Sequence, residues 1–190
     1  MSEENVGWAS GAALANMGFA FLLFLDGFVY TGLLSLSDVI AMLVINLIWI
    51  VGIGYLVAGV IELRRGAEAT GFVILAYSLF GFILGIIFLI TYGLKIFPPP
   101  SPNAMMVFWI FWIFVSIISG VILRPLGKMI SINLYWLAVT FLFLGLAGYG
   151  NVLISLITAI LAFAQSFYNW YIVAALVINT TYKKLILPLK

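Results

Sequence analysis

The chain has 190 residues, of which 66% are hydrophobic and only 7% charged, and its mean hydropathy is strongly positive. A soluble domain of this length would be far more polar, so the composition predicts an integral membrane protein. The chain has neither Cys nor His, and its formal net charge is only +2, so we expect no metal, no cofactor and no nucleic-acid partner.

Six apolar runs follow one another along the chain, each near the 20 residues that a helix needs to cross a bilayer. The runs are continuous rather than alternating, which favours helices over the strands of a barrel. We therefore predict an all-α membrane protein in which residues 1–190 form a single domain with the lipid bilayer around it. Its six transmembrane helices are expected over residues 10–34, 38–61, 70–94, 104–123, 131–149 and 152–178.

The first run places several polar and aromatic side chains on one helix face, because they follow steps of three and four residues. They are Asn16, Phe19, Leu23, Asp26 and Tyr30. This face is a candidate wall of a solute path. Asp26 is the only carboxylate well inside a run, which makes it a candidate for proton binding or gating. The alternative is an interfacial Asp that is hydrogen-bonded to a neighbouring helix.

Most cations lie at every second junction between runs, a pattern that marks cytoplasmic loops. They are Arg64 and Arg65, Arg124 and Lys128, and Lys183, Lys184 and Lys190, whereas only Lys95 lies at an alternate junction. We therefore expect both termini in the cytoplasm.

Later runs contain glycines at helical spacing, such as Gly81 and Gly85, which allow helices to pack closely. Their few polar residues either line a path or hold helices together by hydrogen bonds. These residues are Tyr77 and Ser78, Asn133 and Thr140, and Gln165, Ser166 and Asn169.

The segment from Ala58 to Gly66 reads Ala-Gly-Val-Ile-Glu-Leu-Arg-Arg-Gly and resembles the Ala-Gly-x-x-Glu-x-x-x-Gly segment of the acetate uptake transporter family. This family includes bacterial succinate/acetate permeases. Further matches run in register nearly from end to end. They are Met17-Gly18-Phe19, Ala76-Tyr77, Gly150-Asn151, Asn179 with Tyr182, and Leu187-Pro188.

One segment departs from the family. Ser10-Gly-Ala-Ala-Leu-Ala-Asn16 stands in place of Asn-Pro-Ala-Pro-Leu-Gly-Leu and keeps only one Ala and Leu14. The family's segment is associated with substrate binding, so the resemblance places Leu14 and Asn16 on the substrate path and indicates a divergent member.

The resemblance implies a six-helix protomer in the plasma membrane, assembled as a homo-hexamer, with a conduction path through each protomer. In the family this path narrows at a Phe, a Tyr and a Leu. The Phe corresponds to Phe19 and the Tyr to Tyr77. The Leu corresponds to Thr140 or Val139, because the register of the fifth run is ambiguous by one residue.

These observations predict a channel or transporter for acetate and related small monocarboxylates, and not an enzyme. No Lys or Arg lies in the middle of a run, which favours movement as the acid or together with a proton. Two alternatives stay open: a channel for urea or short amides, and a membrane protein that transports nothing and acts as a partner. No nucleophile, base and orienting residue can be assembled into a catalytic set.

Overall fold

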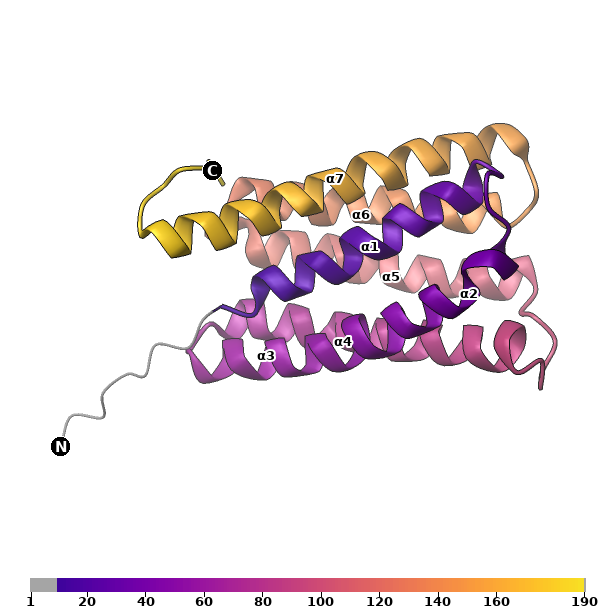
Figure 1. Ribbon diagram of the computed structural model, residues 1–190, viewed down its shortest axis with the longest axis horizontal. Coiled ribbons are helices and arrows are strands. Elements are labelled where there is room, and N and C mark those ends of the chain that lie inside the picture. Colours follow the sequence, from indigo (N-terminus) through magenta and orange to yellow (C-terminus); the bar gives the residue numbers. More distant parts are fainter. Residues whose placement is uncertain (1–9, 190) are drawn as a thin grey trace.

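The computed structural model describes residues 10–189, which form a bundle of helices along one long axis (Figure 1). Six helical segments are long and apolar enough to cross a membrane, which confirms the six predicted runs. Their bounds differ from the predicted ones by a few residues: the first helix ends at Tyr30 rather than at residue 34, and the last continues to Tyr182 rather than ending at residue 178.

The six segments contain ten helical elements. They are α1 (Ala12–Tyr30), α2 (Leu36–Ile45), the π-helix η1 (Asn46–Gly54), α3 (Tyr55–Arg64), α4 (Glu68–Phe88), the π-helix η2 (Leu89–Gly93), α5 (Pro102–Leu123), the 3-10 helix η3 (Arg124–Leu126), α6 (Lys128–Ala147) and α7 (Val152–Tyr182). The second span therefore consists of α2, η1 and α3, and the third of α4 and η2.

Short polar side chains set several helix starts. At the start of α2, Ser35 accepts a hydrogen bond from the Asp38 backbone while the Asp38 side chain accepts one from the Ser35 backbone. At the start of α5, the Ser101 hydroxyl accepts a hydrogen bond from the Ala104 backbone. Asn151 does the same for α7 through Ile154. These bonds satisfy amides that have no partner inside their own helix.

Close helix contacts hold the bundle together. Helix α1 packs mainly against α7, α5 against α6, and α4 against α3 and η1. The Ser78 hydroxyl donates a 2.7 Å hydrogen bond to the Gly52 carbonyl, which ties α4 to η1. The predicted close packing at Gly81 is confirmed, because a Cβ there would lie 2.6 Å from the backbone nitrogen of Gly52.

The outside of the bundle is covered with apolar side chains, as contact with lipid requires. Large exposed examples are Trp49, Phe72, Phe111, Phe114 and Phe167. Polar side chains are instead found inside, among them Asn46, Ser116, Thr140, Gln165 and Asn169.

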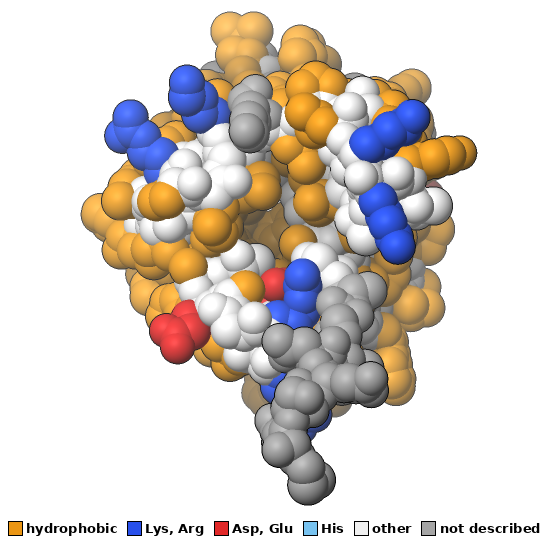
Figure 2. All heavy atoms as spheres, turned by 90° about the vertical axis from the view of Figure 1, so that its left-hand side faces the viewer, with side chains coloured by type: hydrophobic (Ala, Val, Ile, Leu, Met, Phe, Trp, Pro, Cys, Tyr) orange, Lys and Arg blue, Asp and Glu red, His pale blue; other side chains and the backbone are white. Residues whose placement is uncertain are grey.

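The described chain begins and ends at the same end of the bundle (Figure 1). Six cations gather there, at the ends of α3 and α7 and in the connection from η3 to the start of α6, whereas Lys95 follows η2 at the opposite end. Figure 2 shows this cationic end, with blue side chains around a hollow. Lys190 lies outside the described residues. Which side of the membrane this end faces stays a prediction.

Candidate functional site

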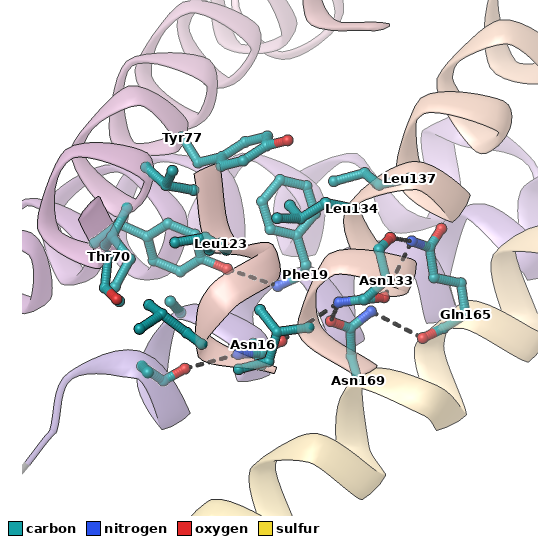
Figure 3. A pocket seen from close by; sticks show the side chains of 17 residues that line it. Asn16, Phe19, Thr70, Tyr77, Leu123, Asn133, Leu134, Leu137, Gln165 and Asn169 are labelled. Atoms are coloured by element: carbon teal, nitrogen blue, oxygen red, sulfur yellow. Dashed lines mark hydrogen bonds between the residues drawn. The ribbon is translucent and has the colours of Figure 1, made fainter. Parts of the chain in front are cut away.

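A cavity of about 80 Å³ lies in the half of the bundle near the cationic end. Helices α1, α3, α4, α5, α6 and α7 all contribute to its wall, which is mostly apolar. We call it the amide cavity, because carboxamide side chains from three helices line it (Figure 3). Its polar lining residues are Asn16, Tyr55, Thr70, Tyr77, Asn133, Gln165 and Asn169.

Backbone carbonyls fix the orientation of three of these amides, because a carbonyl can only accept a hydrogen bond. The Asn16 nitrogen donates to the Ala12 carbonyl at 2.9 Å. The Asn169 nitrogen donates to the Gln165 carbonyl at 2.8 Å. The Gln165 nitrogen donates to the Asn133 carbonyl at 3.0 Å. The amide oxygens of these three side chains are therefore free to meet other donors.

Asn133 joins the three helices through its own amide. Its nitrogen donates to the Asn169 Oδ1 at 2.8 Å and contacts the Asn16 Oδ1 more weakly at 3.5 Å. Its Oδ1 accepts from the Gln165 nitrogen at 3.3 Å. The Thr140 hydroxyl completes the network by donating to the Gln165 Oε1 at 2.7 Å. This ladder of hydrogen bonds runs from α1 through α6 to α7 and stabilises polar groups that would be costly in an apolar interior.

An aromatic barrier closes the deep end of the amide cavity. We define it as Phe19, Phe80 and Phe141, which come from α1, α4 and α6. The rings of Phe19 and Phe80 stack with centroids 5.5 Å apart, and those of Phe80 and Phe141 stack at 5.3 Å. Their side chains are buried, with at most 6% of Phe19 exposed. Such stacking leaves no polar group across the passage.

Tyr77 and Tyr55 stand next to this barrier, but their hydroxyls differ. The Tyr77 hydroxyl lies 2.7 Å from the Ser116 hydroxyl, and Ser116 in turn donates to the Trp112 carbonyl. The Tyr77 hydrogen is therefore directed to Ser116. The Tyr55 hydroxyl instead accepts a 3.1 Å hydrogen bond from the Phe19 backbone amide.

A second, smaller cavity of about 40 Å³ lies on the other side of the barrier. We call it the Asp26 cavity, because Asp26 lines it together with Tyr30 and with Phe80 and Phe141 of the barrier. Among the described residues no side chain of a neighbouring helix is hydrogen-bonded to the Asp26 carboxylate, in contrast to the interfacial alternative. The two cavities thus lie on opposite sides of the barrier.

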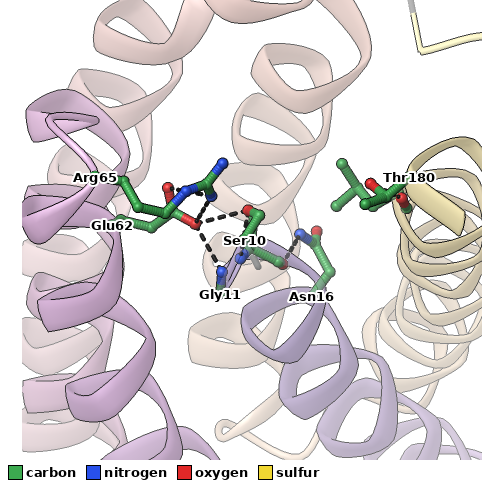
Figure 4. A network of polar contacts seen from close by, with 8 residues as sticks. Ser10, Gly11, Asn16, Glu62, Arg65 and Thr180 are labelled. Atoms are coloured by element: carbon green, nitrogen blue, oxygen red, sulfur yellow. Dashed lines mark hydrogen bonds and ion pairs between the residues drawn. The ribbon is translucent and has the colours of Figure 1, made fainter. Parts of the chain in front are cut away.

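Glu62 fastens the start of α1 to the end of α3 (Figure 4). It is 2% exposed and accepts hydrogen bonds from the Ser10 hydroxyl at 2.6 Å and from the Gly11 backbone at 2.7 Å. It also forms an ion pair of 3.1 Å with Arg65. The segment that departs from the resembling family is thus held in place by the segment that matches it.

The predicted site residues fall into three groups. Phe19, Tyr77 and Asn16 line the amide cavity, and Asp26 lines the other one. Leu14 is half-buried and faces Gly54 of η1, outside the lining of either cavity.

The remaining two predicted site residues are Thr140 and Val139 of α6, the two alternatives for the Leu of the constriction. Thr140 is fully buried and binds Gln165, so it supports the wall without lining a cavity. Val139 is 45% exposed on the outside of the bundle, so this alternative is corrected: its side chain points away from any path through the helices.

Leu137 and Phe141 of α6 also line the cavities and are absent from the predicted site. The same holds for Tyr55 and Phe80. One signal could have found the first two: Asn133, Leu137 and Phe141 follow steps of four residues and so share a face of α6. Within residues 10–189, no three His, Cys, Asp or Glu side chains come together in a way that could hold a metal ion.

The chain is similar to a known protein in fold. No family model matches the chain, and no curated protein sequence matches it. The fold is similar to that of a solved structure, the bacterial acetate channel SatP, with a TM-score of 0.85. The match covers 96% of this chain and 99% of that one at 20% sequence identity. The two chains therefore share a fold over almost their full lengths.

Proposed function

We propose that this protein is a plasma-membrane channel or transporter for acetate and related small monocarboxylates, and a divergent member of the acetate uptake transporter family. The observation that carries the proposal is the pair of cavities on opposite sides of the barrier of Phe19, Phe80 and Phe141. The similarity in fold to the acetate channel SatP supports it.

The chemistry of the barrier fits a small, weakly hydrated solute. A hydrated ion must lose water to pass an apolar constriction and gains no compensating charge here, whereas a short neutral acid loses little. In the part of the chain that the structure describes, no Lys or Arg lines either cavity. We therefore propose that the solute crosses the barrier as the acid or together with a proton, for which the Asp26 carboxylate is a candidate carrier.

A urea or short-amide channel is the second candidate, because carboxamides both donate and accept hydrogen bonds. The four amides of the amide cavity would suit urea in this general sense. We rank it second because the amide oxygens are mostly engaged with each other, as the ladder through Asn133 indicates.

Reconstituted vesicles distinguish these functions. Purified protein in liposomes is given labelled acetate or labelled urea, with an inward proton gradient and without one, and protein-free liposomes serve as the control. We expect saturable acetate uptake that increases with the proton gradient, and little urea uptake. Urea flux without acetate flux at any pH would support the second candidate, and flux of neither would support a membrane partner without transport.

Assembly is a further part of the proposal. We propose a homo-hexamer in which each protomer keeps its own path, so that the exposed apolar faces of the bundle contact both lipid and neighbouring protomers. Mass measurement of the detergent-solubilised protein tests it, and a monomeric mass contradicts it.

A further inference from the structure

Besides the Thr70 hydroxyl, three donors in the amide cavity have a hydrogen that no group within residues 10–189 accepts. A carboxamide nitrogen carries two hydrogens. Asn16 gives one to the Ala12 carbonyl, and Asn169 gives one to the Gln165 carbonyl, so one hydrogen remains on each. The Tyr55 hydroxyl oxygen accepts from the Phe19 amide, so its own hydrogen also remains. All three side chains line the cavity.

The acceptors of the cavity are engaged instead. The Asn169 Oδ1 and the Asn16 Oδ1 both face the Asn133 nitrogen, and the Asn133 Oδ1 accepts from Gln165. The Gln165 Oε1 accepts from Thr140. The carboxamides of the wall therefore offer hydrogens to a solute and few free oxygens, and among residues 10–189 no Lys or Arg lines the cavity.

We propose that Tyr55, Asn16 and Asn169 form the binding site for the carboxylate group of the solute. This inference rests on the proposed function and deepens it, because it names the residues that recognise a monocarboxylate. The oxygens of a carboxylate only accept hydrogen bonds, which matches three donors without a charge. Neutral donors also bind less tightly than a fixed cation, as a path that must release its solute requires.

The remaining wall suits a short aliphatic tail. Val73, Ile74, Leu134 and Leu137 line the same cavity and are apolar. An amide of the same size would fit this tail region equally well. However, it would turn its own N–H groups toward the donors of the site, leaving buried donors unpaired. The site therefore discriminates acetate from acetamide by hydrogen bonding rather than by size.

This placement assigns the recognising hydroxyl to Tyr55 rather than to Tyr77. The Tyr77 hydrogen is directed to Ser116, away from a solute in the cavity. The Tyr55 oxygen is tied to the backbone of Phe19, three residues after Asn16 on the same face of α1. The binding site therefore lies directly against the barrier.

Two substitutions test the site in vesicles by the concentration dependence of acetate uptake. Tyr55→Phe removes one donor, and we expect the half-saturating acetate concentration to rise about tenfold, as for a lost hydrogen bond to a charged group. Asn16→Asp exchanges a donor for a carboxylate of nearly equal size, and we expect saturable uptake to disappear. Tyr168→Phe is the matched control. It also removes a hydroxyl, which binds the Met129 carbonyl outside the cavity, and should leave uptake unchanged.

Different results of these uptake experiments would contradict the binding site and the transport function. Acetate uptake by the wild-type protein together with wild-type saturation in both variants would overturn the site and leave the proposed function standing. No uptake by the wild-type protein would overturn the function and, with it, the site. If Tyr55→Phe does not elute as a monodisperse protein in size-exclusion chromatography, the saturation of uptake by Asn16→Asp alone tests the binding site. Competition adds a second readout: excess acetamide should inhibit acetate uptake far less than excess propionate, and equal inhibition would count against the site.

Discussion

Phe19 lines the amide cavity and contacts both other rings of the barrier. Its ring lies 5.1 Å from that of Tyr77, 5.5 Å from Phe80 and 6.5 Å from Phe141, measured between centroids. Its backbone amide is held by Tyr55. Since the side chain borders the amide cavity and stacks on the wall of the Asp26 cavity, its size sets how far the two cavities are separated.

Truncating this side chain should widen the passage. For Phe19→Ala we expect acetate flux to rise several-fold and acids as long as butyrate to be taken up, because the barrier loses one of its three rings. The folded protein should lose about 3–5 kcal/mol, as large-to-small core substitutions do. Uptake into vesicles and thermal unfolding in detergent measure the two effects.

The matched control is Phe114→Ala, whose side chain is 61% exposed on the outer surface. It should leave solute range and rate unchanged. If Phe19→Ala folds and alters neither the rate nor the range of acids, Phe19 is not part of a barrier.

Residue-level prediction from sequence works within one helix and fails between helices. Asn16, Phe19 and Asp26 could be placed on one face of α1, because helical spacing determines which residues are neighbours. Tyr55 and Asn169 could not be assigned to the same cavity, because they lie on helices far apart in the sequence that carry apolar residues over most of their surfaces. Periodicity does not say which face of such a helix turns inward.

At the scale of elements, the approach of α4 to η1 depends on Gly81. A Cβ on Gly81 would lie 2.6 Å from the Gly52 nitrogen and 2.6 Å from the Leu47 carbonyl oxygen. Both neighbours are backbone atoms, which cannot rotate away as a side chain can. The contact also borders the Ser78 hydrogen bond to Gly52 that joins the same two elements.

Adding one methyl group at this contact should force the helices apart. We expect Gly81→Ala to destabilise the protein by about 1–3 kcal/mol, the usual cost of overpacking. Gly93→Ala is the matched control, because its Cβ would meet no atom nearer than the Leu89 Cδ1 at 3.5 Å. Unfolding temperatures in detergent compare the two variants, and equal values would show that the α4–η1 contact can relax.

The number of spans could be predicted from the apolar runs, whereas the π-helices could not. Where α2 passes into η1, the second run contains a single polar residue, Asn46, and one polar residue does not predict a π-helix. In the folded protein the Asn46 amide donates a 3.2 Å hydrogen bond to the Gly18 carbonyl of α1. This contact between helices lies in the π-helical segment, and the local amino-acid composition does not predict the contact.

At the scale of the whole molecule, the two cavities differ in their polar groups. The amide cavity lies toward the cationic end and has neutral donors, whereas the other cavity contains the Asp26 carboxylate. A solute that crosses the barrier therefore meets different chemistry on each side of it. The direction of the bundle in the membrane decides which chemistry faces the cytoplasm.

Labelling of single cysteines can determine this direction, because the chain has no Cys of its own. Thr181 at the end of α7 and Pro99 in the loop between η2 and α5 are both exposed, lie at opposite ends of the bundle and carry no charge. Cations are retained on the cytoplasmic side, so the cationic end should face inward. A membrane-impermeant maleimide should then label Pro99→Cys on intact cells, and Thr181→Cys only after permeabilisation. The reverse pattern would place the amide cavity on the outside and make Asp26 the first polar group on the cytoplasmic side of the barrier.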